Sequence, residues 1–351
     1  MSGSGGDGNW LVKAIVVGVI GVAGTVLAAV LLEGIQGGDD PGPVVTRTTP
    51  SGATTIPVLD KQSSFTQVGA RPLSLAAGSR KIWVADPTRT EAWWLDATDA
   101  PKTHLEQLPD VRHGLDDPIR PVGVAAADGA AWFVDESHDL LWRIDEATTT
   151  ADPPVRVGNR PGGVAVEGGV VWVLSRAPGE VQRVDANSRS LQGQPIALPL
   201  GIPRAIAAHK GVAWVTGTAA NRRGAVWKLS GDTEPEQTTG VGRAPVVAVA
   251  ATDNAVWIAD LNGNVSKIDP DANVVGATVR LAGRPCGIAV DKDAVWVTDS
   301  DGDQVWRLDP ENALPMGNPI RVEAHPCAVT LDAGTGWIAN QGDNSISRVT
   351  P

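Results

Sequence analysis

The sequence predicts an all-β fold, a seven-bladed β-propeller of four-stranded blades, and three observations support this. First, a unit of about 40 residues repeats, each time with a tryptophan in a short apolar run: Trp83, Trp132, Trp172, Trp214, Trp257, Trp296 and Trp337. Second, a proline opens the preceding run of every unit: Pro72, Pro121, Pro161, Pro203, Pro245, Pro285 and Pro326. Third, the runs are short and bounded by turn residues, which is typical of strands, and four strands per unit make one propeller blade.

The unit from Arg284 to Pro310 shows the expected elements most clearly. Its runs 284–290, 294–299 and 304–310 are rich in Val, Ile, Leu and Trp, and polar turns separate them. Helical periodicity is not sustained in the repeats. Small residues dominate the first run of each unit, which suits a crowded central axis. The large tryptophans follow in the second and third runs, where we expect neighbouring blades to face each other.

The last unit ends without a fourth run, and a matching run stands before the first unit. Residues 64–70 lead into Arg71-Pro72, as residues 155–158 lead toward Arg160-Pro161. We therefore expect residues 64–70 to pair with the last strand and close the ring, which removes exposed sheet edges.

The part of the chain before the repeats predicts a membrane anchor. Residues 14–32 are 19 residues without a charge, long enough as a helix (about 28 Å) for a hydrocarbon core of about 30 Å. Lys13 precedes this segment and acidic residues follow it, so residues 1–13 are expected in the cytoplasm and the propeller outside the cell. Residues 33–63, rich in Gly, Pro and Thr, are expected to form a stalk, and residues 64–351 the propeller. A cleaved signal peptide is the alternative.

The formal net charge is −11. An acidic domain argues against sequence-independent binding to nucleic acid, which needs a basic surface, so no nucleic-acid partner is expected.

Two polar columns should meet at one face of the ring, around the expected mouth of its central channel. Basic residues precede the blade-opening prolines: Arg71, Arg120, Arg160, Arg284 and His325. Aspartates follow the tryptophans by three residues: Asp86, Asp135, Asp260 and Asp299. One interpretation is a funnel for an anionic ligand, and the other is repeated Arg–Asp pairing that ties loops together. Because the feature repeats, we favour the structural interpretation.

Features that break the repeat are better indicators of function. Arg204 stands where other blades have mostly apolar residues, and it needs a ligand or a neighbouring Asp as its partner. Ser175-Arg176, Gly217-Thr218 and Asn340 also depart from the pattern. The longest insertion contains Asp110, His113, Asp116 and Asp117, which could hold a cation or form a solvated loop.

A further basic column lies in the third run of most units: Arg143, Arg183, Lys228, Lys267, Arg307 and Arg348. It is regular enough to be scaffold, with aliphatic stems packed between blades.

The two cysteines, Cys286 and Cys327, are 41 residues apart and occupy one structural position in adjacent blades. Outside the cell such a pair suggests a disulfide. Rotational symmetry argues against it, because equivalent side chains point the same way round the ring and a bridge needs close Cα atoms. Two small buried thiols are the alternative.

The segments 284–290 (RPCGIAV), 294–299 (AVWVTD) and 304–310 (QVWRLDP) resemble the YVTN-type propeller repeat, in the group that includes streptogramin lyases. The resemblance covers residues 64–351. It implies, for a lyase, a His base and a magnesium ion held by carboxylate and His side chains. Glu323 and His325 match in part and are the catalytic candidates, but Asn340 stands where a carboxylate is expected.

The sequence thus predicts a single-pass, extracytoplasmic propeller that binds a protein or cell-surface ligand through Arg71, Arg120, Arg160, Arg204, Arg284 and His325. Two alternatives remain: a metal-assisted lyase or lactone hydrolase at the channel mouth, and a structural spacer or assembly subunit. No cofactor is expected in the leading interpretation, and a divalent metal belongs to the enzyme alternative.

Overall fold

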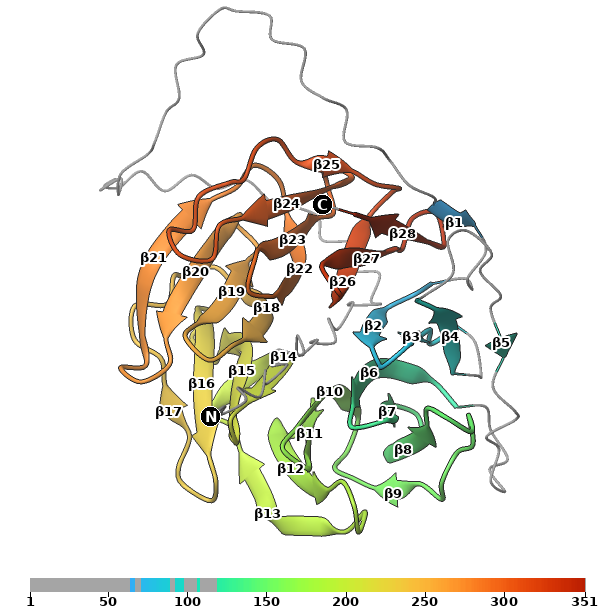
Figure 1. Cartoon of the computed structure of the whole chain (residues 1–351). Coiled ribbons are helices and arrows are strands. Elements are labelled where there is room, and N and C mark those ends of the chain that lie inside the picture. Colours follow the sequence, from blue (N-terminus) through green and yellow to red (C-terminus); the bar gives the residue numbers. More distant parts are fainter. Residues whose placement is uncertain (1–63, 67–70, 89–91, 98–105, 108–118, 351) are drawn as a thin grey trace, which may run out of the picture.

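The computed structural model describes residues 64–66, 71–88, 92–97, 106–107 and 119–350. Within this part of the chain the strands form seven antiparallel sheets of four strands each, arranged as blades around one axis (Figure 1). The predicted all-β, seven-bladed propeller of four-stranded blades is confirmed.

Each blade runs outward from the axis in chain order. Blade 1 contains β2 (Ser74–Ala77), β3 (Lys81–Ala85), β4 (Trp93–Asp96) and β5 (Glu106–Gln107). Blade 2 contains β6 (Pro121–Ala127), β7 (Ala130–Asp135), β8 (Leu140–Asp145) and β9 (Val155–Arg156). Blade 3 contains β10 (Pro161–Glu167), β11 (Val170–Ser175), β12 (Glu180–Asp185) and β13 (Leu191–Ala197). Blade 4 contains β14 (Leu200–His209), β15 (Val212–Ala219), β16 (Gly224–Ser230) and β17 (Glu236–Gln237).

The remaining blades follow the same order. Blade 5 contains β18 (Val246–Ala251), β19 (Val256–Asp260), β20 (Asn264–Asp269) and β21 (Val274–Arg280). Blade 6 contains β22 (Pro285–Val290), β23 (Val295–Asp299), β24 (Gln304–Leu308) and β25 (Ile320–Arg321). Blade 7 contains β26 (Pro326–Asp332), β27 (Thr335–Asn340), β28 (Ser345–Val349) and, as its outer strand, β1 (Ser64–Thr66).

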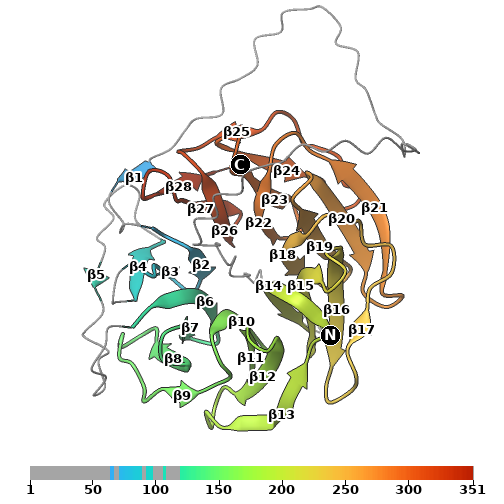
Figure 2. The same cartoon turned by 180° about the vertical axis from the view of Figure 1, so that it is seen from behind.

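The ring closes through β1, which lies beside β28 in both views (Figures 1 and 2). Phe65 is opposite Ile346, and Ser64 is opposite Ser347, in an antiparallel ladder. The predicted closure by an N-terminal strand is confirmed for residues 64–66, and residues 67–70 lie outside the described part of the chain. Closure satisfies the outer edge of β28 with a strand from the other end of the propeller.

The repeated tryptophans fill the spaces between blades. Trp172 of blade 3 is buried in one apolar cluster with Ile206 of blade 4, and Trp257 of blade 5 is buried with Ile288 of blade 6. A Cβ atom on Gly336 of blade 7 would lie 2.7 Å from the Trp296 ring of blade 6. The predicted packing of these tryptophans against the next blade is therefore confirmed, and its apolar burial stabilises the ring.

The basic column of the third strands belongs to the same blade contacts. The guanidinium of Arg143 lies 5.9 Å from the centre of the Trp132 ring, within cation–π range. Nζ of Lys228 in blade 4 donates a hydrogen bond of 2.7 Å to the carbonyl of Pro270 in blade 5. The predicted scaffold role is confirmed for these contacts, which are made by the charged groups, and the expected packing of aliphatic stems between blades stays a prediction.

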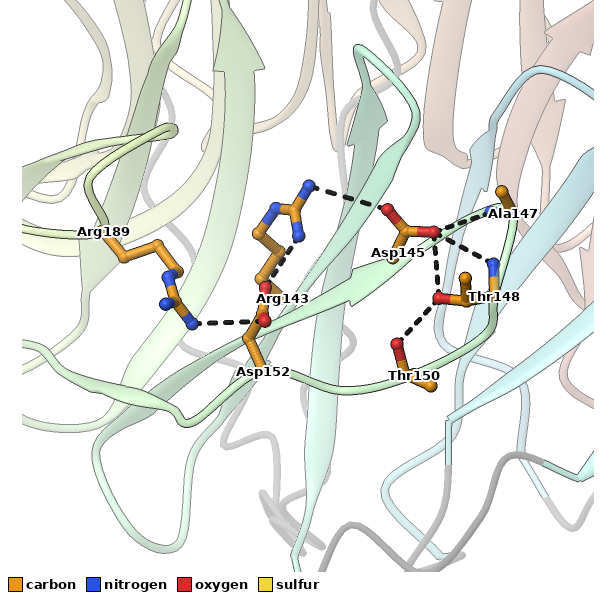
Figure 3. Close-up of polar contacts among 7 residues, drawn as sticks. All are labelled: Arg143, Asp145, Ala147, Thr148, Thr150, Asp152 and Arg189. Carbon is orange, nitrogen blue, oxygen red and sulfur yellow. Dashed lines mark hydrogen bonds and ion pairs between the residues drawn. The ribbon is translucent and has the colours of Figure 1, made fainter.

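Figure 3 shows how one of these cations, Arg143, contacts the turn between β8 and β9. Arg143 contacts Asp152 at 2.7 Å, and Arg189 of blade 3 contacts the same carboxylate at 3.3 Å. Asp145 accepts hydrogen bonds from the backbone and hydroxyl of Thr148, at 2.9 and 3.0 Å. These bonds hold the pKa of Asp145 below its usual value. The turn thus joins its own strands and, through Asp152, the next blade.

The predicted membrane span, residues 14–32, lies outside the described residues, as do the tail 1–13 and the stalk 33–63. Among the residues that are described, no helix has the length and apolar character needed to cross a bilayer.

Candidate functional site

First strands begin and second strands end at the same face of the ring. Pro121 pairs with Asp135, Pro161 with Ser175, Pro285 with Asp299 and Pro326 with Asn340. We call this the entry face, made of the residues that precede the first strands and those that end the second strands. It carries both polar columns that the sequence analysis singled out.

The aspartates of the entry face bind the backbone of the arginine residues. Asp86 accepts a hydrogen bond of 3.0 Å from the Arg71 N–H, and Asp135 accepts one of 2.9 Å from the Arg120 N–H. Asp299 accepts one of 2.8 Å from the Arg284 N–H. In blade 5, which has no arginine in this position, Asp260 accepts bonds from Asn262 and Asn264. The expected Arg–Asp tie between loops is present in these three pairs, and it is made by the backbone N–H of the arginine.

Arg160 and His325 are held by carboxylates of the preceding blade. The Arg160 N–H donates to Asp139 at 2.8 Å, and the His325 N–H donates to Asp303 at 2.9 Å. Both residues have positive φ, 50° and 53°, a conformation that needs local support in residues other than glycine. Their side chains, like those of Arg120 and Arg284, are exposed.

Arg176 and Arg160 share one carboxylate. Oε1 of Glu136 lies 3.2 Å from NH1 of Arg176 and 3.3 Å from NH2 of Arg160. Burial lowers the pKa of Arg176; Glu136 opposes this, and nearby Arg160 and Arg204 lower the pKa further. Sequence analysis had singled out Arg176 only as a break in the repeat, and its contact with Glu136 depends on the packing of blades 2 and 3.

Arg204 lies in β14 without an ion pair among the described residues. Its Nε is buried and has no acceptor in that part of the chain. Burial lowers the pKa of Arg204, and nearby Arg284 lowers it further. Of the two expected partners of Arg204, a ligand or a neighbouring Asp, the described residues provide no Asp. In blade 4 the aspartate position at the end of the second strand is occupied by Gly217, which pairs with Pro203.

The other repeat-breaking residues are buried at the same level. The hydroxyls of Ser175 and Thr218 have no hydrogen-bond partner among the described residues. Nδ2 of Asn340 donates to the hydroxyls of Ser345 and Ser347, at 3.1 and 2.8 Å. Asn340 is thus tied to its own blade.

Cys286 and Cys327 are joined by a disulfide, and their Cα atoms are 4.8 Å apart. The symmetry argument overestimated their separation. First strands converge near the axis, where the hydroxyl of Thr298 in blade 6 reaches the carbonyl of Cys327 in blade 7 at 2.9 Å. This proximity brings equivalent positions of adjacent blades within bridging distance.

The candidates for metal binding that lie in the described part of the chain are not gathered into one centre. The described part of the chain contains no group of three or more His, Cys, Asp or Glu side chains placed to hold a metal ion. Glu323 is partly buried and His325 is exposed beside it in sequence. The insertion with Asp110, His113, Asp116 and Asp117 lies outside the described residues.

These features define a seven-bladed β-propeller with arginines gathered on its entry face. No protein-family model and no curated protein sequence matches the chain. Virginiamycin B lyase from Staphylococcus aureus has a similar structure, with a TM-score of 0.65 at 16% identity over 82% of this chain and 98% of the lyase.

Two other solved structures are similar to the same extent. Hydrazine synthase of Kuenenia stuttgartiensis gives a TM-score of 0.68 at 13% identity, over 82% of this chain and 97% of that one. The WD40 propeller domain of Doa1 gives 0.66 at 11% identity, over 83% and 96%. At these identities the likeness is one of fold, and the expected resemblance to streptogramin-lyase-like propellers is confirmed at that level.

Proposed function

We propose that this protein is a membrane-anchored, extracytoplasmic recognition module that binds a protein or cell-surface ligand through its entry face. The observation that supports the proposal is that the backbone and the side chains of the entry-face arginines have different roles. Backbone N–H groups of Arg71, Arg120 and Arg284 hold the loops, so their guanidinium groups are not needed for that task. A rigid closed ring then presents the cationic side chains to a ligand.

Propellers of this shape occur in protein assemblies, which supports a protein partner. A similar fold is present in the mitotic checkpoint complex, with a TM-score of 0.67 at 14% identity. Fold likeness alone does not transfer a function, so the entry-face arginines remain the main support.

The anchor is proposed from the sequence of residues 14–32, which contain no charge. Residues 33–63 would then serve as a stalk that holds the propeller away from the membrane. Alkaline extraction should leave the full-length protein in the membrane fraction. Release into the supernatant would contradict the anchor.

A pull-down from native membranes tests recognition, with the full-length protein and residues 58–351 as two baits. A stoichiometric partner held by both baits supports recognition by the propeller. A partner held only by the anchored form would assign binding to the membrane segment, and no partner with either bait would contradict the proposal.

A metal-assisted lyase is the second candidate, favoured by the fold shared with virginiamycin B lyase and by the Glu323–His325 pair. A general base at His325 needs a metal or an acid opposite it, and Asn340 is instead bound to Ser345 and Ser347. Elemental analysis of the purified protein separates the two functions. A stoichiometric divalent metal that is lost in His325→Ala would favour the enzyme.

A further inference from the structure

Blades 3 and 4 reverse the charge pattern of the entry face. In blades 1, 2, 5 and 6 the second strand ends at an aspartate or directly before one: Asp86, Asp135, Asp260 and Asp299. In blades 3 and 4 the paired positions are Ser175 and Gly217. The same two blades introduce Arg176 and Arg204. Two acidic positions are therefore replaced by neutral residues at the place where two cations are added.

The added cations are poorly compensated by the described residues. Arg204 has no ion pair there, and Arg176 shares the single oxygen Oε1 of Glu136 with Arg160. Nε of both Arg176 and Arg204 is buried without an acceptor. Arg160 and Arg204 act electrostatically on Arg176, and Arg284 acts on Arg204.

The backbone of blade 3 is shaped around Arg176. A Cβ on Gly162 would lie 2.5 Å from Nε and 3.1 Å from Cγ of Arg176. Glycine at this position therefore allows the arginine to lie against the start of the first strand. Other blades carry larger residues there, including Leu73 and Val122.

Two neutral hydrogen-bonding residues are near these cations in the sequence or the strand register: Ser175 precedes Arg176, and Thr218 pairs with Ile202. Ser175 is fully buried and Thr218 is 8% exposed, and neither hydroxyl has a partner among the described residues. Buried polar groups are normally hydrogen-bonded. Guanidinium N–H groups form strong, often bidentate hydrogen bonds to carboxylate and phosphate oxygens.

We infer that the sector of blades 3 and 4, centred on Arg176 and Arg204, binds an oxyanion group, a carboxylate or phosphate carried by the ligand. The inference rests on the proposed function and specifies its ligand chemistry. The planar guanidinium fork fits two oxygens of either group. One carboxylate oxygen of Glu136 already contacts both Arg160 and Arg176, so guanidinium groups of this sector do bind a carboxylate.

Isothermal titration of the full-length protein in detergent tests the inference, with pyrophosphate and citrate as separate probes at low ionic strength. Arg176→Gln and Arg204→Gln should each weaken binding of the accepted probe at least tenfold. Arg280→Gln is the matched control, because Arg280 is exposed on the outer strand β21 and its loss changes the net charge equally. Binding should be unchanged in this control.

The outcomes of the titration distinguish the two sources of the oxyanion. Preference for pyrophosphate assigns a phosphate source, and preference for citrate assigns a carboxylate source. The inference is overturned if neither probe shows saturable binding. It is also overturned if all three substitutions weaken binding equally, because that result would reflect net charge alone.

Denaturant unfolding without ligand should show that Arg204→Gln is at least as stable as the parent. A clear loss of stability would make Arg204 a structural residue. A further variant combines Arg176→Gln and Arg204→Gln. If this variant and the parent both retain the same partner in the pull-down, the oxyanion site is overturned while recognition stands.

Discussion

Gly162 and Arg176 are fitted to each other: a Cβ atom at residue 162 would lie 2.5 Å from Nε of the arginine. Arg176 in turn lies 3.2 Å from Glu136 of the preceding blade. A residue without a side chain thus fixes where a cation of the entry face is placed, and this contact joins blades 2 and 3.

Gly162→Ala should displace Arg176 and weaken oxyanion binding about as much as Arg176→Gln. The clash is with a flexible side chain, so the loss of unfolding free energy should stay at or below about 1–3 kcal/mol. Titration and urea unfolding measure the two effects. Gly276→Ala is the control, since its new Cβ would meet the Lys267 carbonyl at an ordinary 3.7 Å. Unchanged binding in Gly162→Ala would contradict the fit.

Glu146 should be a stabilising contact between blades 1 and 2. Its buried carboxylate accepts from Nε1 of Trp83 at 3.0 Å and from the Ser79 N–H at 3.1 Å. Glu146→Ala leaves both donors without this acceptor and should cost about 1–3 kcal/mol. Urea unfolding measures the loss, with exposed Glu311→Ala as the control. Equal stability of the two variants would show that the contact is not formed.

Deletion of residues 58–70 removes β1 and leaves the outer edge of β28 without its partner. Because the strand closes the ring, the whole propeller should lose stability and unfold cooperatively at lower denaturant. Circular dichroism and fluorescence transitions should coincide. A soluble product with the stability of the parent would refute the closure.

The disulfide between Cys286 and Cys327 closes a loop with a sequence separation of 41 residues. On the chain-entropy model, replacing both cysteines by alanine should lower the unfolding free energy by about 4 kcal/mol. Peptide mapping of the unreduced protein should yield a crosslinked pair containing both cysteines. Quantitative alkylation of both thiols without a reductant would show that the bond is absent.

Asp332 should make stability depend on pH. Burial raises the pKa of Asp332, and Arg348 opposes that rise. A carboxyl whose pKa is higher in the folded state favours folding below its unfolded pKa of about 3.9, and this contribution is lost as pH rises through the folded value. Asp332→Asn should therefore be more stable than the parent at pH 7.

That gain should shrink toward pH 3, where the carboxyl of the parent is protonated in both states. Thermal unfolding at the two pH values measures it, with exposed Asp271→Asn as the control. A variant that loses stability at pH 7 would indicate that the ionised carboxylate is stabilising.

The repeat was sufficient to predict the blades because their strands and turns are specified by short stretches of sequence. Alternating short apolar runs and turns specify strands, and a tryptophan every 40 residues or so specifies what lies between sheets. The missing fourth strand and the matching residues 64–70 predicted closure for the same reason. The described strand β1 covers Ser64–Thr66, and the rest of the expected segment lies outside the described residues.

The contacts of the entry face could be predicted only in part. The sequence placed Arg71 and Asp86 in matching columns, yet the bond runs from the arginine backbone. A position that repeats in the sequence predicts where along the blade a residue lies. It does not predict which atom of that residue is nearest the carboxylate.

By itself the sequence determined the number of blades, their strand order, the closure and the scaffold role of the basic column, because these follow from repeated local patterns. The tertiary structure decided that Arg176 contacts Glu136, that Arg204 has no ion pair among the described residues, and that Cys286 reaches Cys327. Those outcomes depend on distances across blade boundaries and around the axis. Separation along the chain does not encode such distances.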